Sequence, residues 1–218
     1  MNHICKYCNN TCIKKGVRNF VQKYLCKICN KYQQKAYKYR KYTELEKKDI
    51  INLTKEGACI SSISRIILRS KSSIQREIYK AGNLVYKPLY NENNEEYELD
   101  EMTLMIAGKK DIYLIYAINR RTRQVVDFFI GNRTKENIKR VVDSVLCYFP
   151  KTVYTDRLNS YPSLIPSAIH KPGRRLTNRI ERKNLTFRTS VKRLSKCTLC
   201  FTRKIELLTA TMKLICWA

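Results

Sequence analysis

The feature that most constrains the fold is a pair of Cys-x-x-Cys motifs near the start of the sequence. Cys5 and Cys8 form the first motif, Cys26 and Cys29 form the second, and 17 residues separate them. Each motif is a tight turn that directs two thiolates to one point, and the intervening segment is long enough for a short hairpin. Four sulfurs at this spacing typically enclose one Zn²⁺ tetrahedrally. The sequence therefore predicts a structural zinc ribbon; the alternative is two reduced thiol pairs in a loop.

The charge of the chain is strongly positive and unevenly distributed. Its 218 residues include 44 Lys and Arg against 18 Asp and Glu, a net charge of +26. Residues 1–43 carry no acidic residue, residues 157–218 carry only Glu181 and Glu206, and the centre is nearly balanced. Basic flanks of this kind argue for a polyanionic partner, most simply nucleic acid. They argue against a metabolic enzyme that acts on small acidic or neutral molecules.

Other classes of protein are also excluded. Hydrophobic residues make up 44% of the chain, which argues against wholesale disorder. No apolar run approaches the ~20 residues that span a bilayer, and the start of the sequence lacks the apolar run and cleavage site of a secretion signal. In a basic intracellular chain, cysteines indicate metal ligands rather than disulfides.

Residues 43–82 show helical periodicity, and they follow the zinc ribbon and basic connector expected at 1–42. We expect a helix from Thr43 to Gly57, a second at 60–67, a turn at 68–70, and a third that is N-capped by Ser70 and ended by Gly82. The inward residues of the second and third helices are expected to be Ile63, Ile66, Ile67, Ile74 and Ile78. This pattern predicts a helix-turn-helix, although any three-helix unit with a basic face would look similar. The outward residues expected to contact DNA bases or phosphates are Lys71, Ser72, Gln75 and Arg76.

After an Asn-rich and Glu-rich linker at 83–96, the region 97–218 has the pattern of a mixed α and β domain. Strands are expected at 97–105, 112–119 and 124–130, a helix at 134–148, a strand at 152–156, a short strand at 168–170, and helices at 178–194 and 202–215. Three hairpin-connected strands, a helix, a strand and further helices match the order of an RNase H-like fold. The fold class expected for the chain is therefore α+β or α/β, with an RNase H-like domain behind the zinc ribbon and helix-turn-helix.

Carboxylates fall where such a fold places its metal ligands, at Asp100, Asp156 and Glu181. Phosphodiester chemistry uses two divalent cations about 3.5–4 Å apart, and Mg²⁺ prefers hard oxygen ligands. Glu181 is surrounded by the cations Arg179, Arg182 and Lys183, which are expected to hold phosphate.

Each carboxylate also has a structural alternative. Asn178 and Glu181 have the spacing of a capping box, and Asp156 could cap a short helix at 159–164. Asp100 is adjacent to Glu101, and strand alternation puts the two on opposite faces, so only one of them is expected to be a ligand. Alternation does not choose between them.

A third Cys-x-x-Cys motif, at Cys197 and Cys200, lacks a partner pair within reach. We therefore expect these cysteines to begin the last helix rather than to bind a second zinc.

Nearly the whole chain resembles a transposase of the IS-one insertion-sequence family. The resemblance is carried by the N-terminal Cys-x-x-Cys pairs, the helix-turn-helix and three motifs: Leu99-Asp100-Glu101-Met102, Tyr154-Thr155-Asp156, and Asn178-Arg179-Ile180-Glu181-Arg182-Lys183-Asn184-Leu185. The 24 residues between Asp156 and Glu181 also resemble the short spacing of that family. The sequence departs from the family at Thr103, where an aromatic residue is frequent, and at Arg157, where Gly is frequent.

The resemblance implies a DDE recombinase in which Asp100, Asp156 and Glu181 bind Mg²⁺ or Mn²⁺, and it favours Asp100 over Glu101. It implies cleavage at the element ends and strand transfer into target DNA, by at least a homodimer on double-stranded DNA. A prokaryotic cytoplasmic protein associated with the nucleoid is expected. The alternatives are a DNA-binding regulator without chemistry and a copy inactivated by the residues at 103 and 157.

Overall fold

The computed structural model describes residues 3–18, 20–34, 41–90, 93–106, 109–173, 175–194 and 203–218. It divides the chain into two compact units, Met1–Thr43 and Glu44–Ala218. Within the described ranges, none of the helices has the length and apolar character needed to cross a membrane.

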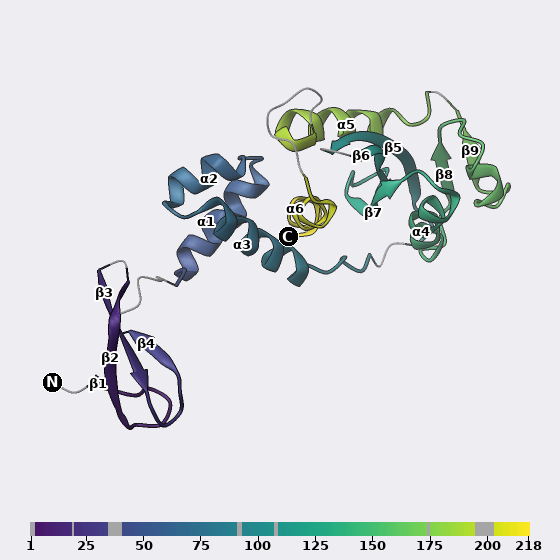
Figure 1. Ribbon diagram of the computed structural model, residues 1–218. Helices are drawn as coiled ribbons and strands as arrows, with labels where there is room; N and C mark the ends of the chain where they lie inside the picture. The colour runs from purple at the N-terminus through teal and green to yellow at the C-terminus, as the bar shows by residue number, and fades with distance from the viewer. Residues whose placement is uncertain are drawn as a thin grey trace. The chain divides into compact units, whose positions relative to one another are not determined.

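The first unit is a four-stranded antiparallel sheet of order β1-β2-β3-β4 (Figure 1). Its strands are β1 (His3–Ile4), β2 (Thr11–Arg18), β3 (Val21–Cys26) and β4 (Tyr32–Gln34). The sequence Cys-Lys-x-Cys-Asn occurs twice in this unit, and Asn9 and Asn30 at its ends both have left-handed backbone angles, with φ of 56° and 53°. Asn tolerates this conformation better than most residues, so the two turns are built alike.

The second unit begins with three helices, α1 (Glu44–Lys55), α2 (Ile60–Ile67) and α3 (Lys71–Leu84). Gly57 has a φ of +75° and ends α1, because the Gly57 and Ala58 amides donate to the carbonyls of Thr54 and Leu53. Leu68 ends α2 in the left-handed region, and the Ser70 side chain accepts from the Ser73 amide at the start of α3. The predicted helix boundaries at Gly57 and Ser70 are therefore confirmed.

Two expectations for these helices are wrong. Ile66 was expected to point inward, but its side chain is 60% exposed, since only Ile63 of the eight-residue helix α2 is fully buried. Gly82 does not end α3, which continues to Leu84. A Cβ at Gly82 would lie 2.4 Å from the carbonyl oxygen of Ala210, so this glycine permits a close helix crossing.

The remainder of the second unit is a five-stranded mixed sheet of order β7-β6-β5-β8-β9. Its strands are β5 (Glu96–Ile106), β6 (Lys109–Asn119), β7 (Val125–Asn132), β8 (Thr152–Thr155) and β9 (His170–Pro172). The first three are antiparallel neighbours, whereas β8 runs parallel to β5 and β9 parallel to β8. The helices are α4 (Lys135–Leu146), α5 (Asn178–Ser190) and α6 (Ile205–Trp217), with 3₁₀ turns at Tyr161–Ser163 and Lys192–Leu194. The chain is thus a mixed α+β protein, and the long helix expected at 178–194 is shorter than predicted.

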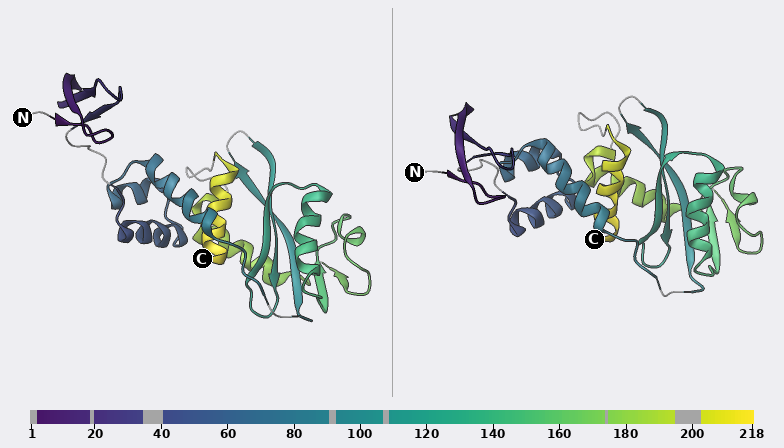
Figure 2. Two further views of the ribbon diagram at one scale, coloured as in Figure 1. Left: turned by 90° about the horizontal axis from the view of Figure 1, so that it is seen from below. Right: turned by 60° about the horizontal axis from the view of Figure 1, so that its bottom comes forward.

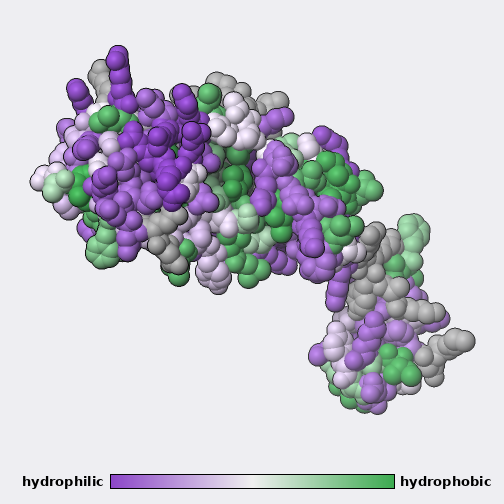
Figure 3. Space-filling model, turned by 180° about the vertical axis from the view of Figure 1, so that it is seen from behind, coloured by the Kyte–Doolittle hydropathy of each residue, from purple (hydrophilic) through white to green (hydrophobic). Residues whose placement is uncertain are grey.

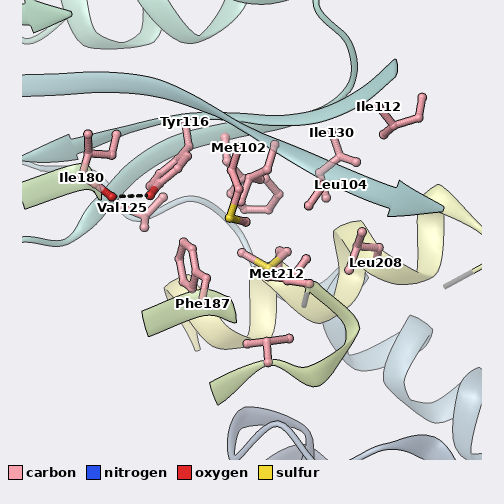
Figure 4. Packing of buried hydrophobic residues seen from close by; sticks show 14 of the residues in the cluster. Met102, Leu104, Ile112, Tyr116, Val125, Ile130, Ile180, Phe187, Leu208 and Met212 are labelled. Atoms are coloured by element: carbon pink, nitrogen blue, oxygen red, sulfur yellow. Dashed lines mark hydrogen bonds between the residues drawn. The ribbon is translucent and has the colours of Figure 1, made fainter. Parts of the chain in front are cut away.

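Helices cover both faces of this sheet, with α4 on one face and α5 and α6 on the other (Figure 2). Alternate residues of the central strands point to opposite faces of the sheet and belong to two separate hydrophobic cores. Leu99 and Ile115 pack with α4, whereas Met102 and Tyr116 pack with Phe187 of α5 and with α6 (Figure 4). This two-sided burial explains why β6 is continuously apolar from Ile112 to Ile118.

Helix α6 packs against α1 and α3 as well as against β7. Its residues Leu208 and Met212 belong to the core beneath the sheet, and Ala210 faces Gly82 of α3. The predicted helix at 202–215 is therefore present from Ile205. The expectation for Cys197 and Cys200 falls outside the described residues.

Candidate active site and metal centre

The four cysteines predicted to bind zinc lie together in the first unit. The Sγ atoms of Cys5 and Cys29 are 3.5 Å apart, those of Cys8 and Cys26 are 3.4 Å apart, and all four lie within 4.8 Å of one another. Cys5 and Cys26 are buried. Four convergent thiols are the donor set that suits Zn²⁺, so the residues present fit a structural zinc site.

A fifth cysteine in this unit has a different environment. Cys12 accepts a hydrogen bond from Gln33 Nε2 at 2.7 Å and is not one of the four grouped thiols. Within the group the thiols are not equivalent: a hydrogen bond from the Asn10 amide lowers the pKa of Cys8 to about 6, and burial raises the pKa of Cys29 to about 12. Cys12 is therefore a natural control for the four others.

A group of carboxylates lies where the two central parallel strands of the large sheet diverge. Carboxylate oxygens of Asp100, Glu101 and Asp156 lie within 4.8 Å of one another. Glu98 is the last residue of β5 that pairs with β8, opposite Tyr154. Asp156 lies two residues beyond Tyr154 and is thus level with Asp100, past the end of the strand pairing. The predicted proximity of Asp100 and Asp156 is present.

Asp100 and Glu101 point to opposite faces of β5, as alternation predicts. Asn184 Nδ2 of α5 donates to Asp100 Oδ2 at 2.8 Å on one face. On the other face, the Tyr161 hydroxyl donates to Glu101 Oε1. The expectation that only one of the two is a metal ligand stays a prediction, although oxygens of both lie within 4.8 Å of an Asp156 oxygen. Because the pairing of β8 with β5 has ended, the carboxylate of Asp156 at the strand edge is within reach of both.

Asp100 is oriented by a short chain of polar groups. The Tyr116 hydroxyl lies 2.8 Å from Asn184 Oδ1 and 3.1 Å from the carbonyl oxygen of Ile180, so it can donate to either. With Oδ1 turned to Tyr116, the amide nitrogen of Asn184 faces Asp100. The Glu101 amide donates to Asp100 Oδ1 at 2.8 Å. Both oxygens of Asp100 therefore have a fixed donor.

The carboxylates are partly buried and repel one another. Burial, with smaller contributions from the charges of Asp156 and Glu181, raises the pKa of Asp100 to about 6. Burial and the charges of Asp156 and Asp100 raise the pKa of Glu101 to about 7, against the opposing hydrogen bond from Tyr161. A divalent cation would relieve this repulsion, and carboxylate oxygens are the ligands that Mg²⁺ and Mn²⁺ prefer. The donor set therefore fits such a cation.

Glu181 lies on the first turn of α5, exposed and outside the group of three. Its charge still contributes to the pKa of Asp100. The capping-box alternative is not formed among the described residues: Thr177 precedes the helix, makes no side-chain cap hydrogen bond, and leaves Asn178 inside the first turn. Glu181 is thus near the acidic group and has no helix-capping role.

Asp156 has a local role beside its place in the group. Its Oδ1 accepts from the Leu158 amide at 2.9 Å, which orders the turn after β8. The 3₁₀ turn that follows starts after Ser160, so Asp156 does not cap it. Arg157 and Thr103, where the sequence departs from the family pattern, are both exposed.

The cations and polar residues expected to contact DNA are accessible. Lys71, Ser72, Gln75 and Arg76 are exposed on the first two turns of α3, and Arg179 and Arg182 are exposed on α5. Lys183 lies partly buried, with Nζ 5.4 Å from the centre of the Phe187 ring. Figure 3 shows hydrophilic side chains gathered over the end of the larger unit where β8, β9 and the start of α5 lie.

Sequence reasoning assigned no role to Glu98 and Tyr161. Glu98 is completely buried and accepts from two backbone amides of α5, and Tyr161 is completely buried beside Glu101. The available signal for Glu98 was an acidic residue between the apolar residues Tyr97 and Leu99, two positions before Asp100 and on the same face. Nothing in the pattern around Tyr161 distinguishes it from an ordinary aromatic core residue.

A mixed sheet covered by helices on both faces, with carboxylates grouped where its interior parallel strands β5 and β8 separate, defines an α+β protein with an acidic site. The family model described as IS1 transposase matches residues 96–215, more than half of the chain. This protein belongs to the IS1 transposase family.

Relatives support the same family. The insertion element iso-IS1n protein InsB of Shigella dysenteriae is 35% identical over 111 residues, which cover 50% of this chain and 85% of the relative. The insertion element IS1 4 protein InsB of Escherichia coli (strain K12) is 33% identical over 112 residues, covering 50% and 66%. A solved chain from a simian T-cell lymphotropic virus intasome in complex with PP2A regulatory subunit B56 gamma has 11% identity and a TM-score of 0.41, covering 75% of this chain and 66% of that chain. That likeness is too low to carry an argument.

Proposed function

We propose that this protein is a DDE-type transposase that cuts DNA at the ends of its element and joins the freed 3′ ends to target DNA. Asp100, Asp156 and Glu181 are the ligands of divalent cations, Mg²⁺ or Mn²⁺. The observation that carries the proposal is the convergence of two carboxylates, Asp100 within β5 and Asp156 just past β8, in a chain that belongs to a transposase family. The strand order β7-β6-β5-β8-β9 supports an RNase H-like catalytic domain.

The proposed cation ligands differ in how firmly they are held. Asp100 is fixed by Asn184 and by the Glu101 amide, so its carboxylate is oriented in advance. Glu181 is exposed on the first turn of α5, from which its side chain can turn toward the same site when DNA is bound. Bound cations would polarise the scissile phosphate and stabilise the attacking and leaving oxygens.

Basic residues are proposed to hold the DNA around this site. Arg179 and Arg182, together with Lys183, flank Glu181 on α5 and would contact phosphates. Gln75 and Arg76 of α3 would contact base edges of the terminal inverted repeats, in the manner of a recognition helix. The zinc ribbon would add affinity for the ends, and two ends would be joined by a homodimer or larger assembly. The division into a ribbon at 1–42, a helix-turn-helix at 43–82, a linker at 83–96 and a catalytic domain at 97–218 is part of this proposal.

The test is a strand-transfer assay with the full chain, oligonucleotides copied from the DNA flanking its coding sequence, Mg²⁺ and a target plasmid. We expect the wild type to form joined products and Asp156→Asn/Glu181→Gln to lose about a thousandfold or more in rate, because two of the three proposed ligand charges are removed. The matched control is Asp143→Asn, an exposed acid on α4, whose rate should be unchanged.

Two outcomes would overturn the proposal in different ways. Joining at the wild-type rate by the double variant would remove Asp156 and Glu181 from the chemistry. A wild type that binds the ends in a gel-shift assay but neither cuts nor joins them would be a DNA-binding regulator or an inactive copy.

A further inference from the structure

We propose that Glu98 is a positioning residue that holds the first turn of α5, and with it Glu181, against the strand that carries Asp100. The inference deepens the proposed function, since it assigns the geometry of that site to a buried carboxylate outside it. Glu98 lies on β5, is 0% exposed, and shares a strand face with Asp100.

The contacts of Glu98 join three segments of the chain. Its Oε2 accepts from the backbone amides of Arg179 and Ile180 at 3.0 and 2.9 Å. Its Oε1 accepts from Arg120 Nε at 3.0 Å, at the end of β6. A carboxylate is an acceptor only, and all three of these partners are donors. The side chain therefore links β5, the β6–β7 turn and the start of α5.

Helix α5 depends on this carboxylate because its own cap is missing among the described residues. Thr177, at the cap position, makes no side-chain hydrogen bond to the first turn. The first amides of a helix need acceptors, and a negative charge beside them is favoured by the helix dipole. Glu98 supplies both from a neighbouring strand, so the helix start is fixed to the sheet rather than to its own preceding loop.

The hydrogen bonds of Glu98 lie close to two proposed metal ligands, Asp100 and Glu181. Glu181 directly follows Ile180, the second amide held by Glu98, and Asp100 lies two residues along the strand from Glu98. One side chain thus sets the separation between a fixed ligand on β5 and the exposed ligand on α5. Arg120 is held in turn by stacking on Tyr154 of β8, with its guanidinium carbon 4.0 Å from the ring centre.

Glu98→Gln tests this role, and Glu96→Gln is the matched control. A glutamine has almost the same shape but replaces one acceptor oxygen with a donor group, which would then face Arg120 or the amides of α5. Glu96 lies on the same strand and accepts from Arg120 Nη1 at 3.2 Å, but it has no hydrogen bond to α5 among those described. Both variants lose one negative charge beside Arg120, and only Glu98→Gln loosens the helix.

We expect Glu98→Gln to increase amide exchange at residues 179 and 180 by about tenfold or more, because their two amides lose a charged acceptor in either orientation of the glutamine. In the joining assay its rate at saturating DNA should fall by about tenfold or more, while the dissociation constant for end DNA stays within about twofold. Glu96→Gln should match the wild type in all three measurements. A Glu98→Gln variant with wild-type exchange and rate, or one that loses only DNA affinity, would overturn the inference.

A second arm separates positioning from general destabilisation. If Glu98 acts through Glu181, Glu98→Gln should lower the rate much less in a Glu181→Gln background than in the wild type. Equal losses in both backgrounds would contradict that route. Thermal unfolding of each variant shows whether the chain is folded at the assay temperature.

The role of Glu98 can still be tested if the wild type shows no joining. That result would overturn the proposed function but not the inference about Glu98. Mn²⁺ binding measured by electron paramagnetic resonance should then weaken in Glu98→Gln and in Glu181→Gln, without a further loss in the double variant. Unchanged Mn²⁺ affinity and amide exchange in Glu98→Gln would overturn the inference.

Discussion

The two groups of candidate metal ligands in this protein are built in opposite ways. The four thiols come from two copies of one five-residue turn, at Cys5–Asn9 and Cys26–Asn30, within a small sheet. The three grouped carboxylates come from two strands that are distant in sequence and meet only when the large sheet forms. The thiol group is therefore assembled by residues close together in the sequence, whereas the carboxylate group is assembled only when the larger unit folds.

The difference extends to energetics. Four thiols around one point offer a closed tetrahedral site, and binding of a metal ion there is coupled to folding of the small unit. The carboxylates are only partly buried, and they carry raised pKa values because burial and mutual repulsion oppose their charge. A closed site stabilises the fold. An open site keeps uncompensated negative charge, which favours binding of a cation and, through it, of a phosphate.

The largest expected effect comes from breaking the closed site. Cys26→Ser removes one of two buried ligands, so we expect zinc content to fall from about one to near zero per chain and the first unit to unfold. The measurements are metal analysis of the purified protein and limited proteolysis within residues 3–34.

Cys12→Ser is the control for that variant, because Cys12 bonds to Gln33 and lies outside the four-thiol group. It should retain zinc and protease resistance. Equal zinc loss in the two variants would show that the ligand set is not Cys5, Cys8, Cys26 and Cys29.

An intermediate effect is expected from removing a charge that burial and the neighbouring carboxylates oppose in the open site. Asp100 has a pKa of about 6 in the folded protein and about 3.9 in an unfolded chain. Its stabilising contribution is therefore complete below about pH 4 and is lost as the pH rises through 6. Asp100→Asn should raise the free energy of unfolding by about 2 kcal/mol at pH 8 and by almost nothing at pH 4.

Trp217 is the only tryptophan and packs on Phe128 in the larger unit, so its fluorescence follows unfolding of that unit in urea. The buffer should lack Mg²⁺ but contain no chelator, so that zinc is retained. A gain in stability that is equal at the two pH values would mean that Asp100 is not held above its ordinary pKa.

The smallest expected effect concerns Glu101. Its carboxylate approaches Asp156 from the other face of β5, so Glu101→Gln should weaken Mn²⁺ binding by about three- to tenfold, less than Asp156→Asn does. Titration calorimetry with Mn²⁺ checks this. Glu136→Gln, on the exposed first turn of α4, is the control. Unchanged affinity in Glu101→Gln would restrict the site to one face of the strand.

The same contrast explains what could be predicted from the sequence. The thiol group, the turn at Leu68 and the cap at Ser70 depend on residues close together in the chain, and spacing alone located them. The nearness of Asp100 and Asp156 was predictable from the order of strands. The approach of Glu101 to Asp156 was not, because alternation describes one strand and says nothing about where a neighbouring strand stops pairing.

Long-range partners were also beyond sequence reasoning. Spacing suggested that Asn178 and Glu181 cap α5, whereas the acceptor for its first amides is Glu98 from a strand far upstream. Gly82 has the sequence signature of a helix end, but its lack of a side chain permits α3 to cross closely over α6 at Ala210. Such contacts depend on the tertiary arrangement and leave no local pattern.

Helix α6 has a consequence for how proteins of this kind could change their DNA specificity. It is the common packing partner of α3 and of the core beneath the sheet, with Gly82 and Ala210 in direct opposition. Replacing α1–α3 alone with those of a relative would bring a foreign surface against an unchanged α6. A productive exchange would have to carry α6 as well, which lies far downstream of α1–α3 in the sequence. Under the proposed role of α3 as a reader of the element ends, new end recognition is therefore more accessible through single substitutions on the exposed face of α3 than through the shuffling of whole segments.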